Sequence, residues 1–492
     1  MHRIWYSENC SKSFSFALDS TTDVGFIIAE TNHQGVKQME KNLTTGSVFK
    51  NIIVFSLPYL LSYLLQTLYG MADLYIIGQF EGIASTTAVS IGSQVMHMLT
   101  VMIVGLAMGA TVFIGQAIGG DDRKKAAAGI GNTVTLFMAV SVALTAVLVL
   151  LVRPIASVMA TPKDAMQGTM DYLTICFIGI PFITAYNVIS AVFRGMGDSK
   201  SPMYFIAVAC AANIGLDYLF MGIFHLGPAG AALGTTLSHA ISVAVSLVVI
   251  LKRKTGIPMS REAFRPKRTV MGEIMKIGVP VALQDGLIQI AFIVITVIAN
   301  HRGLDDSAAV GIVEKIMSFL FLIPSSMLST VSALGAQNIG ANKPERAVAT
   351  LRYAAMLAVG FGVMVAAAMQ FLAEPVVSLF TDASAADGAE VVRLGGQYLR
   401  GYVWDCIFAG VHFCFSGYFC AVGKSGISFL HKIIAIALMR IPGVYMTSMM
   451  FPDTLFPMGL ATASGSVISV MICLIAFFIL SRKERSNAKE NA

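Results

Sequence analysis

Charged side chains are scarce in this chain of 492 residues, of which only 13% are Asp, Glu, Lys or Arg. A soluble domain usually carries about 25% charged residues. The shortage therefore excludes an ordinary soluble protein, and it also excludes a disordered chain or a coiled coil. Hydrophobic residues make up 56% of the sequence, which is enough for about a dozen membrane helices of roughly 20 to 25 residues each.

Several kinds of chemistry are missing as well. The seven cysteines form no C-x-x-C motif, so neither a disulfide framework nor a zinc site is indicated. The GKS at 423–425 lacks the P-loop glycine five positions earlier, where Tyr418 stands, which argues against ATP as the energy source. No nucleophile, base or metal constellation indicates an enzyme or a cofactor. The net charge of +6 is spread over short loops, so nucleic acid is not an expected partner.

The first 47 residues are polar and lack the 7 to 15 apolar residues of a secretory signal. Met39, in MEKNLTTGSVFK, stands directly before the first apolar segment. We therefore hypothesise that residues 1–38 are dispensable or an upstream extension of the reading frame.

Apolar segments recur from residue 49 onward and predict an all-α membrane protein with twelve spans. The expected organisation is a polar N-terminal segment (1–47), an N-lobe of six spans (48–251), a basic linker (252–271), a C-lobe of six spans (272–480) and a tail (481–492). The spans are expected at 49–72, 85–113, 129–152, 168–192, 203–224, 230–251, 272–299, 308–334, 351–373, 396–420, 429–450 and 457–480.

Basic residues mark one side of these spans. Nearly all loop Lys and Arg, with Arg194 counted among them, fall on the side of the linker, whereas the opposite loops hold only Arg153, Lys163, Arg302 and Arg393. Because cytoplasmic loops retain Lys and Arg, both termini are expected in the cytoplasm of a multi-pass protein of the bacterial inner membrane. The linker, KRKTGIPMSREAFRPKR at 252–268, is expected to be solvated, with contact to anionic lipid as the alternative.

The two halves repeat each other. GQAIGGDDRKKAAA (115–128) matches AQNIGANKPERAVA (336–349), and FRGMGDS (193–199) matches FCAVGKS (419–425). Because each half has an even number of spans, the halves insert in the same orientation, a parallel repeat typical of transporters. Gln116 and Gln337, at matching span ends, are expected to cap or cross-link helices, and Gly105 with Gly109 to allow close helix packing.

These motifs carry a family resemblance. The sequence resembles the bacterial multidrug and toxic compound extrusion (MATE) transporters over residues 44–480, through MADLYIIGQFEG (71–82), GATVFIGQAIGGDDRKKA (109–126), NIGLDYLF (213–220), GPAGAALGTTLS (227–238) and ALGAQNIGANKPERA (333–347). The resemblance implies cation-coupled antiport of organic cations by two six-helix lobes that open alternately to either side of the membrane.

Acidic residues inside spans are functional candidates because they are costly in a membrane. Asp217 lies among apolar neighbours, Asn213 lies four residues earlier, and Asp73 ends the first span. Their oxygens suit Na⁺, while burial favours a protonated carboxyl, so either ion fits. The resemblance implies that Asp73, Asn213, Asp217 and Thr235 form the N-lobe cation site. The alternatives are helix packing for Asp217 and an interfacial carboxylate for Asp73.

The second half is less well defined. The family resemblance implies an acid in the seventh span of some members, for which Asp285 and Gln289 are approximate substitutes, and an acid in the tenth span, where this chain has Asp405. These three residues form a candidate substrate or ion site in the C-lobe. Arg440 is an isolated base that needs a partner, and Glu314 and Asp405 are the candidates. Glu314 could instead pair with Lys315.

The sequence therefore predicts a multidrug exporter driven by Na⁺ or H⁺, with small organic cations and membrane lipid as partners and no obligatory protein partner. A flippase for a lipid or lipid-linked oligosaccharide is the main alternative, although the span-embedded bases that would hold pyrophosphate are few (Lys315, Arg400 and Arg440). A channel is a third possibility, which fits buried carboxylates and paired lobes less well.

Overall fold

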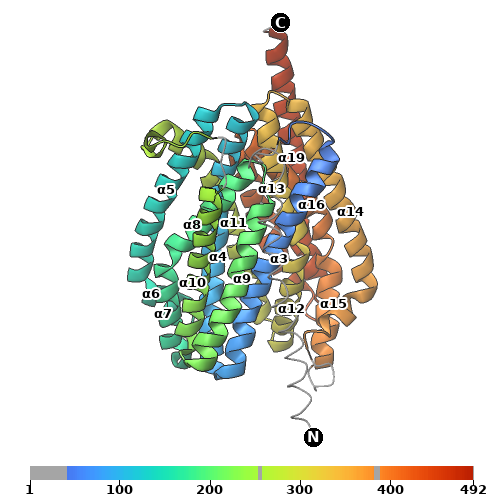
Figure 1. Cartoon of the computed structure of the whole chain (residues 1–492). Coiled ribbons are helices and arrows are strands. Elements are labelled where there is room, and N and C mark those ends of the chain that lie inside the picture. Colours follow the sequence, from blue (N-terminus) through green and yellow to red (C-terminus); the bar gives the residue numbers. More distant parts are fainter. Residues whose placement is uncertain (1–41, 253–256, 382–387, 491–492) are drawn as a thin grey trace, which may run out of the picture. The chain divides into compact units, whose positions relative to one another are not determined.

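The computed structural model describes residues 42–252, 257–381 and 388–490, with the side chains of 484–490 left out. These residues form helices and connecting loops, and no strand occurs among them (Figure 1). The first half contains α3 (Val48–Phe80), α4 (Ile83–Gly119), α5 (Arg123–Leu150), α6 (Val152–Val158), α7 (Lys163–Ile178), α8 (Ile180–Gly195), α9 (Lys200–Asp217), the π-helix η1 (Tyr218–Ile223) and α10 (Gly227–Lys252).

After the 3₁₀ turn η2 (Arg261–Phe264), the second half contains α11 (Arg268–Asn300), α12 (Leu304–Leu320), α13 (Leu322–Gly340), α14 (Pro344–Val377), α15 (Gly388–Tyr402), α16 (Asp405–Ala421), α17 (Ser425–Ala435), the π-helix η3 (Ile436–Arg440), α18 (Ile441–Met450) and α19 (Phe456–Glu490). The expected dispensable segment, 1–38, lies outside the described residues.

Twelve membrane spans account for these helices. Ten segments are long and apolar enough to cross a membrane, and two bent pairs, α7 with α8 and α15 with α16, supply the other two, with bends of 48° and 42°. The expected count of twelve is confirmed. The first helix continues beyond the expected end of the span at residue 72, to Phe80, and the single buried acid Asp73 does not end it.

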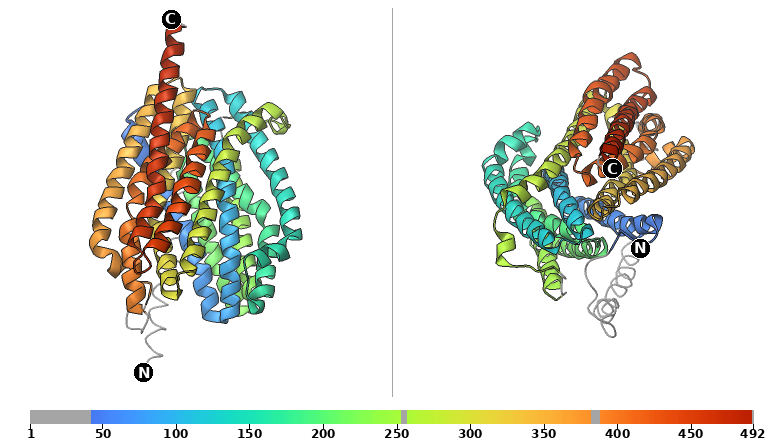
Figure 2. Two further views of the ribbon diagram at one scale, coloured as in Figure 1. Left: turned by 180° about the vertical axis from the view of Figure 1, so that it is seen from behind. Right: turned by 90° about the horizontal axis from the view of Figure 1, so that it is seen from above.

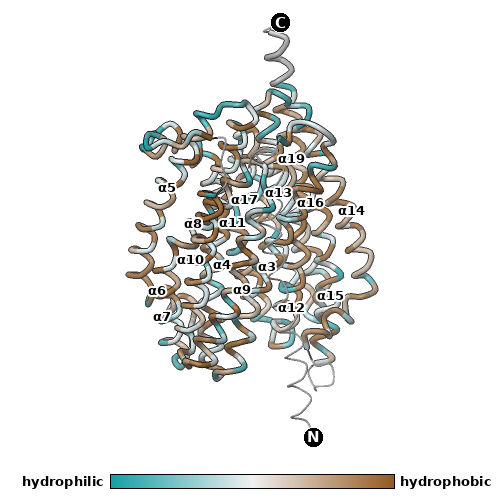
Figure 3. The backbone as a smooth tube through the Cα atoms, viewed as in Figure 1, coloured by the Kyte–Doolittle hydropathy of each residue, from teal (hydrophilic) through white to brown (hydrophobic). Residues whose placement is uncertain are grey.

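Hydropathy is distributed as a membrane environment requires. The outer surface carries many exposed large apolar side chains, among them Phe371 at 81% and Ile223 at 67%, whereas hydrophilic residues concentrate at the two ends of the bundle (Figure 3). A soluble protein would not expose this much apolar surface.

The end that carries η2 and the start of α3 is called here the linker end, and the opposite end the far end.

The helices divide into two lobes. Seen along the bundle axis, the teal and green helices of the first half lie on one side, and the orange and red helices of the second half on the other (Figure 2). Each lobe has its own apolar core. One core is built around Ile77, Leu173 and Phe177, and the other around Val313, Leu399 and Val444.

The internal repeat is visible in the backbone of two pairs of loops. Asp121 and Asn342, at matching positions after α4 and α13, both have a φ of 55°. Gly197 and Gly423, in the second matching pair of loops, also have positive φ, at 87° and 72°. Asn and Asp tolerate this left-handed conformation better than most residues, and glycine adopts it freely. The repeated residues therefore encode the same turns in both halves.

Close contacts between the lobes depend on small residues. A Cβ added to Gly109 on α4 would overlap the carbonyl oxygen of Ile274 on α11, and one added to Gly278 would overlap that of Leu106. The expected close packing at Gly105 and Gly109 is therefore confirmed. The first helix, α3, also contacts the C-lobe, because its Phe49 packs edge to face on Tyr353 of α14, with ring centroids 6.1 Å apart.

The described part of the linker is docked rather than free. Asn132 of α5 donates through Nδ2 to the carbonyl of Ala263 at 3.1 Å and accepts from the backbone N–H of Lys267 at 2.6 Å. Thr135 donates to the carbonyl of Phe264 at 2.9 Å. Polar side chains of α5 therefore bind the backbone of residues 263–267, while the side chains of residues 264–267 are exposed, and the solvated linker stays a prediction.

Candidate ion and substrate sites

Three helices of the N-lobe bring together the four residues that the sequence singled out. Asp73 comes from α3, Asn213 and Asp217 from α9, and Thr235 from α10. All four are buried, with at most 5% of each residue exposed. They lie toward the far end of the lobe, since α3 and α9 run to that end and α10 starts there.

The contacts within this group are specific. The Thr235 hydroxyl donates to Oδ2 of Asp73 at 3.2 Å. The carboxyl groups of Asp73 and Asp217 are close enough to interact electrostatically. A Cβ on Gly234 would overlap Oδ1 of Asp217, so the absence of a side chain at Gly234 gives this carboxyl group its place against α10.

Several polar atoms of the group have no hydrogen-bond partner. They are Oδ1 of Asp73, both carboxyl oxygens of Asp217, and the amide oxygen and nitrogen of Asn213. Buried polar atoms are nearly always paired, and leaving them unpaired costs about 1 to 3 kcal/mol each. Four of these five atoms are oxygens, so the group offers the ligand type that Na⁺ prefers and a place for a proton.

The surroundings hold these residues in position. α9 passes into η1 directly after Asp217, and short π-helical segments of this kind are frequent at functional sites. The ring Nδ1 of His239 lies 2.9 Å from the carbonyl oxygen of Thr235, and the rings of Tyr69 and Tyr186 pack edge to face against His239. Sequence reasoning did not find Tyr69, which lies one helical turn before Asp73 on α3, and its closeness to Asp217 depends on the packing of α3 against α9, which no sequence pattern shows.

The C-lobe contains a different buried cluster. Arg440, at the end of η3, lies 3.8 Å from Asp405 Oδ2 and donates to the hydroxyl of Tyr402. Its guanidinium also stacks over the ring of Phe292, 5.2 Å from the centroid. Of the two partners expected for Arg440, Asp405 is therefore the one that pairs with it. The other, Glu314, accepts from Thr296 at 3.2 Å, and no ion pair with Lys315 occurs in the described chain.

Of the three C-lobe candidates, Asp285 and Asp405 have different neighbours, although both lie within electrostatic reach of Lys432. Asp405 belongs to the cluster with Arg440, while a Cβ on Gly105 of α4 would lie 3.0 Å from Oδ2 of Asp285, which places Asp285 at the seam between the lobes. Gln289 is partly exposed. Within the described residues, no hydrogen bond or ion pair joins Asp285, Gln289 and Asp405.

The internal repeat relates Arg440 to the N-lobe group. The offset of the GDS and GKS turns, Ser199 against Ser425, places Arg440 opposite Ile214, the neighbour of Asn213. The C-lobe thus carries a guanidinium in the region where the N-lobe carries amide and carboxyl oxygens. Because Asp405 is paired with the permanent positive charge of Arg440, it has less need of Na⁺ or a proton to balance its own charge.

Two glutamines tie the lobes together at the linker end. Gln116 Nε2 donates to the carbonyl of Ala421 at 2.8 Å, and Gln337 Nε2 donates to the carbonyl of Gly195 at 3.0 Å. Gln337 also accepts from the backbone N–H of Leu43 at 3.1 Å. The expectation that both glutamines cross-link helices is confirmed, and the helices belong to opposite lobes.

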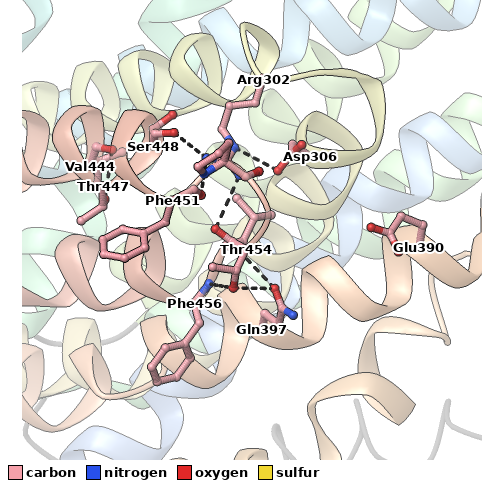
Figure 4. Close-up of polar contacts among 12 residues, drawn as sticks. Arg302, Asp306, Glu390, Gln397, Val444, Thr447, Ser448, Phe451, Thr454 and Phe456 are labelled. Carbon is pink, nitrogen blue, oxygen red and sulfur yellow. Dashed lines mark hydrogen bonds and ion pairs between the residues drawn. The ribbon is translucent and has the colours of Figure 1, made fainter.

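The far end of the C-lobe is held by Arg302 (Figure 4). Its guanidinium pairs with Asp306 at 3.0 Å and donates to the backbone carbonyl of Ser448 near the end of α18 and to that of Pro452 in the loop between α18 and α19, both at 2.7 Å. Gln397 accepts from the hydroxyl of Thr454 in the same loop at 2.8 Å. These contacts fix the loop to α12 and α15.

Comparison with known proteins gives consistent matches across both lobes. A family model for MatE matches residues 58–219 and 280–446. The probable multidrug resistance protein YpnP of Bacillus subtilis is 29% identical over 401 residues, which cover 82% of this chain and 88% of the relative. The multidrug export protein MepA of Staphylococcus aureus is 25% identical over 438 residues, which cover 88% and 95%.

Solved structures share the fold. A crystal structure of a MATE protein in complex with MaL6 superposes with a TM-score of 0.83 at 21% identity, covering 93% of this chain and 100% of the other. An outward-facing structure of a multidrug resistance MATE family transporter also gives a TM-score of 0.83 at 21% identity, with coverage of 93% and 100%. The two-lobe arrangement of twelve spans is therefore shared with known transporters.

Proposed function

Because this chain belongs to the MatE family of transporters, we propose that it exports lipophilic organic cations from the cell in exchange for Na⁺ or H⁺ moving inward. The transport is by alternating access, with the two lobes opening in turn to either side of the membrane. The protein sits in the bacterial inner membrane with both termini in the cytoplasm. A role as a transporter rather than an enzyme follows from the family.

The proposed ion coupling rests on one observation. Asp73 and Asp217 lie side by side in a buried group in which Oδ1 of Asp73 and both oxygens of Asp217 have no hydrogen-bond partner. Two like charges in a dry environment repel each other, and each alone is costly to bury. A single proton or Na⁺ ion cancels one of the two charges and so lowers both the repulsion and the cost of burial, which favours binding of the ion. Thr235 and Asn213 supply further oxygen atoms to the same ion.

The coupling follows from this balance. Entry of one ion from outside cancels one of the two negative charges, and α3 and α9, which carry the pair, then pack more closely because the repulsion is reduced. Loss of the ion to the cytoplasm restores the negative charge, which again attracts a cationic compound to the N-lobe. Ion and substrate therefore compete for the same negative charge, and only one is held at a time.

The nature of the cargo is supported by the relatives and by the charge pattern. YpnP and MepA carry multidrug resistance and multidrug export in their names. Of the three bases that the sequence placed inside spans, two are already paired, Arg440 with Asp405 at 3.8 Å and Arg400 with Glu374 at 2.9 Å. The acidic N-lobe group suits a cation instead.

Transport into everted membrane vesicles tests the proposal. We expect a fluorescent lipophilic cation to accumulate under a H⁺ or a Na⁺ gradient, and the effective gradient identifies the coupling ion. Asp73→Asn and Asp217→Asn should each abolish accumulation, whereas Asp171→Asn, which changes an exposed carboxylate on α7, should leave it intact. Transport of normal rate in both site variants would overturn the role of the acidic pair. A wild-type protein inactive under either gradient would contradict the proposed cargo.

A further inference from the structure

A second group of polar side chains lies between the acidic group and the linker end of the N-lobe. α3 contributes Ser62, Tyr63 and Gln66 to a narrow pocket, and α8 contributes Tyr186, Asn187 and Arg194. Tyr186 connects the two regions, since its ring packs on His239 next to Thr235. Arg194 is the only charged residue among those that line the pocket, so the lining carries a positive charge, whereas the group at Asp73 and Asp217 is acidic.

Arg194 is unusually well buried for an arginine. The sequence places it among the loop bases, but it lies in the last turn of α8 with only 6% of its surface exposed. Its guanidinium packs over the ring of Tyr59, 5.2 Å from the centroid. Its Nε has no hydrogen-bond partner, and no ion pair to it occurs within the described residues. A buried arginine normally pairs with an acid or with carbonyl oxygens.

A chain of hydroxyl groups directs a second donor to the same pocket. Ser329 of α13 donates to the hydroxyl of Tyr59 at 2.9 Å, and Tyr59 donates to the hydroxyl of Tyr63 at 3.1 Å. The hydroxyl hydrogen of Tyr63 is then left to donate to something else, and Tyr63 lines the pocket beside Arg194. The pocket thus offers one charged and one neutral donor and lacks an acidic residue among its lining side chains.

We propose that Arg194 and Tyr63 form a subsite that binds a carboxylate group on the transported compound. Carboxylates accept charge-assisted hydrogen bonds from guanidinium groups in preference to other donors. The proposal deepens the proposed function, on which it rests: a cargo that also carries a carboxylate can place its cationic part toward the N-lobe acids or Asp285, which is within electrostatic reach of Tyr63.

The position of the subsite connects it to the contact between the lobes. Arg194 directly precedes Gly195, whose carbonyl accepts from Gln337 of the C-lobe, and Tyr59 is held by Ser329 of the same lobe. A carboxylate bound to Arg194 therefore lies in the N-lobe, next to residues that hydrogen-bond to the C-lobe.

Binding of a matched pair of dyes to the purified full-length transporter tests the subsite. The pair is a rhodamine as its free carboxylic acid and the same rhodamine as its methyl ester, followed by fluorescence anisotropy. Loss of one charge-assisted hydrogen bond costs about 1.5 to 3 kcal/mol, so Arg194→Gln should weaken binding of the acid by roughly tenfold or more. Tyr63→Phe should weaken it by a smaller factor. Both variants should leave binding of the ester within about twofold.

Controls keep a folding defect apart from a binding defect. Arg393→Gln, which removes an exposed arginine paired with Glu390, should leave both dyes unaffected, and each variant must elute as a single species. Equal loss of acid and ester in Arg194→Gln would overturn the proposal, and so would equal binding of both dyes by all variants.

An independent readout separates this proposal from the export function. The sodium salt of 2-naphthoic acid, which has no cationic group, should raise the unfolding temperature of the wild type but not of Arg194→Gln. If neither rhodamine binds the wild type, the cationic cargo is wrong, while stabilisation by naphthoate alone still supports the subsite. If naphthoate has the same effect on both proteins, the subsite is wrong.

Discussion

Gln116 and Gln337 make equivalent hydrogen bonds from opposite lobes. Gln116 donates to Ala421 and Gln337 to Gly195, and each of these carbonyls lies at the matching position of the repeated FRGMGDS and FCAVGKS segments. The two bonds close the linker end of the molecule. Opening of that end during transport must break both of them.

Removing the two bonds should favour the opened linker end. A neutral hydrogen bond contributes about 0.5 to 1.5 kcal/mol, so Gln116→Ala with Gln337→Ala should shift the ratio of the two conformations by roughly five- to a hundredfold. Spin labels on the exposed residues Lys124 and Glu345, in a background without native cysteines, report the distance by electron paramagnetic resonance. Gln167→Ala, an exposed glutamine, is the control. An unchanged distance distribution would show that the glutamines do not hold the lobes together.

The acidic pair should make stability depend on the coupling ion. A ligand that binds only the folded state stabilises by about 2.7 kcal/mol at a hundred times its dissociation constant. The unfolding temperature of the wild type should therefore rise either with Na⁺ at fixed pH or with acidification in its absence. Asp217→Asn should lose this response and Asp171→Asn should keep it. A response that survives in Asp217→Asn would place the ion elsewhere.

Gly234 allows a test that leaves both carboxyl groups in place. A Cβ at this position would overlap Oδ1 of Asp217, so Gly234→Ala should displace the carboxyl group and weaken ion-dependent stabilisation by tenfold or more in apparent affinity. Gly215→Ala is the matched control, because a Cβ there meets nothing within 4 Å. Equal behaviour of the two variants would mean that Asp217 adapts freely and that its position is not critical.

The Asp405–Arg440 pair should behave as a buried ion pair. Removing one partner of such a pair costs about 3 to 5 kcal/mol, whereas replacing both by apolar residues of similar volume is often tolerated. Asp405→Asn should therefore lower the unfolding temperature, and Asp405→Leu with Arg440→Met should recover much of the loss. A double variant as unstable as the sum of the single ones would show that the two residues act independently.

Arg302 should determine the order of the loop between α18 and α19. Because its guanidinium holds several carbonyls of that loop, Arg302→Ala should increase hydrogen exchange over residues 449–455 and leave the N-lobe unchanged. Arg123→Ala, which removes an ion pair with Asp121 in the other half of the chain, should have no such effect. Protection that is unchanged in Arg302→Ala would mean that the contacts of Gln397 alone suffice.

The twelve spans and the repeat could be predicted because hydropathy and repeated turn residues are local signals. The positions of Asp73, Asn213, Asp217 and Thr235 in one group also matched the expectation from sequence. Side-chain partners across helices could not be predicted in this way. The choice between Glu314 and Asp405 for Arg440 depends on how η3 faces α16, and no local pattern encodes that orientation.

Two placements depend on contacts between helices that the sequence does not show. Asp285 lies at the seam between the lobes because α11 packs on α4 of the other lobe, and these two helices are far apart in the sequence. Arg194 lies in the last turn of α8, a buried helix. Because glycines follow it in FRGMGDS, the sequence placed it among the loop residues. Charge counting assigns a residue to a side of the membrane but not to a depth.

The glutamine contacts are reciprocal, since each half donates to the other through the same residue and accepts at the same position. Reciprocity of this kind is the property of an interface between two identical copies related by a twofold axis. A chain of only six spans with one such glutamine and one such carbonyl would present this patch to a second copy of itself, and pairing would form both bonds. The present gene is therefore consistent with duplication and fusion of a six-span ancestor that worked as a homodimer.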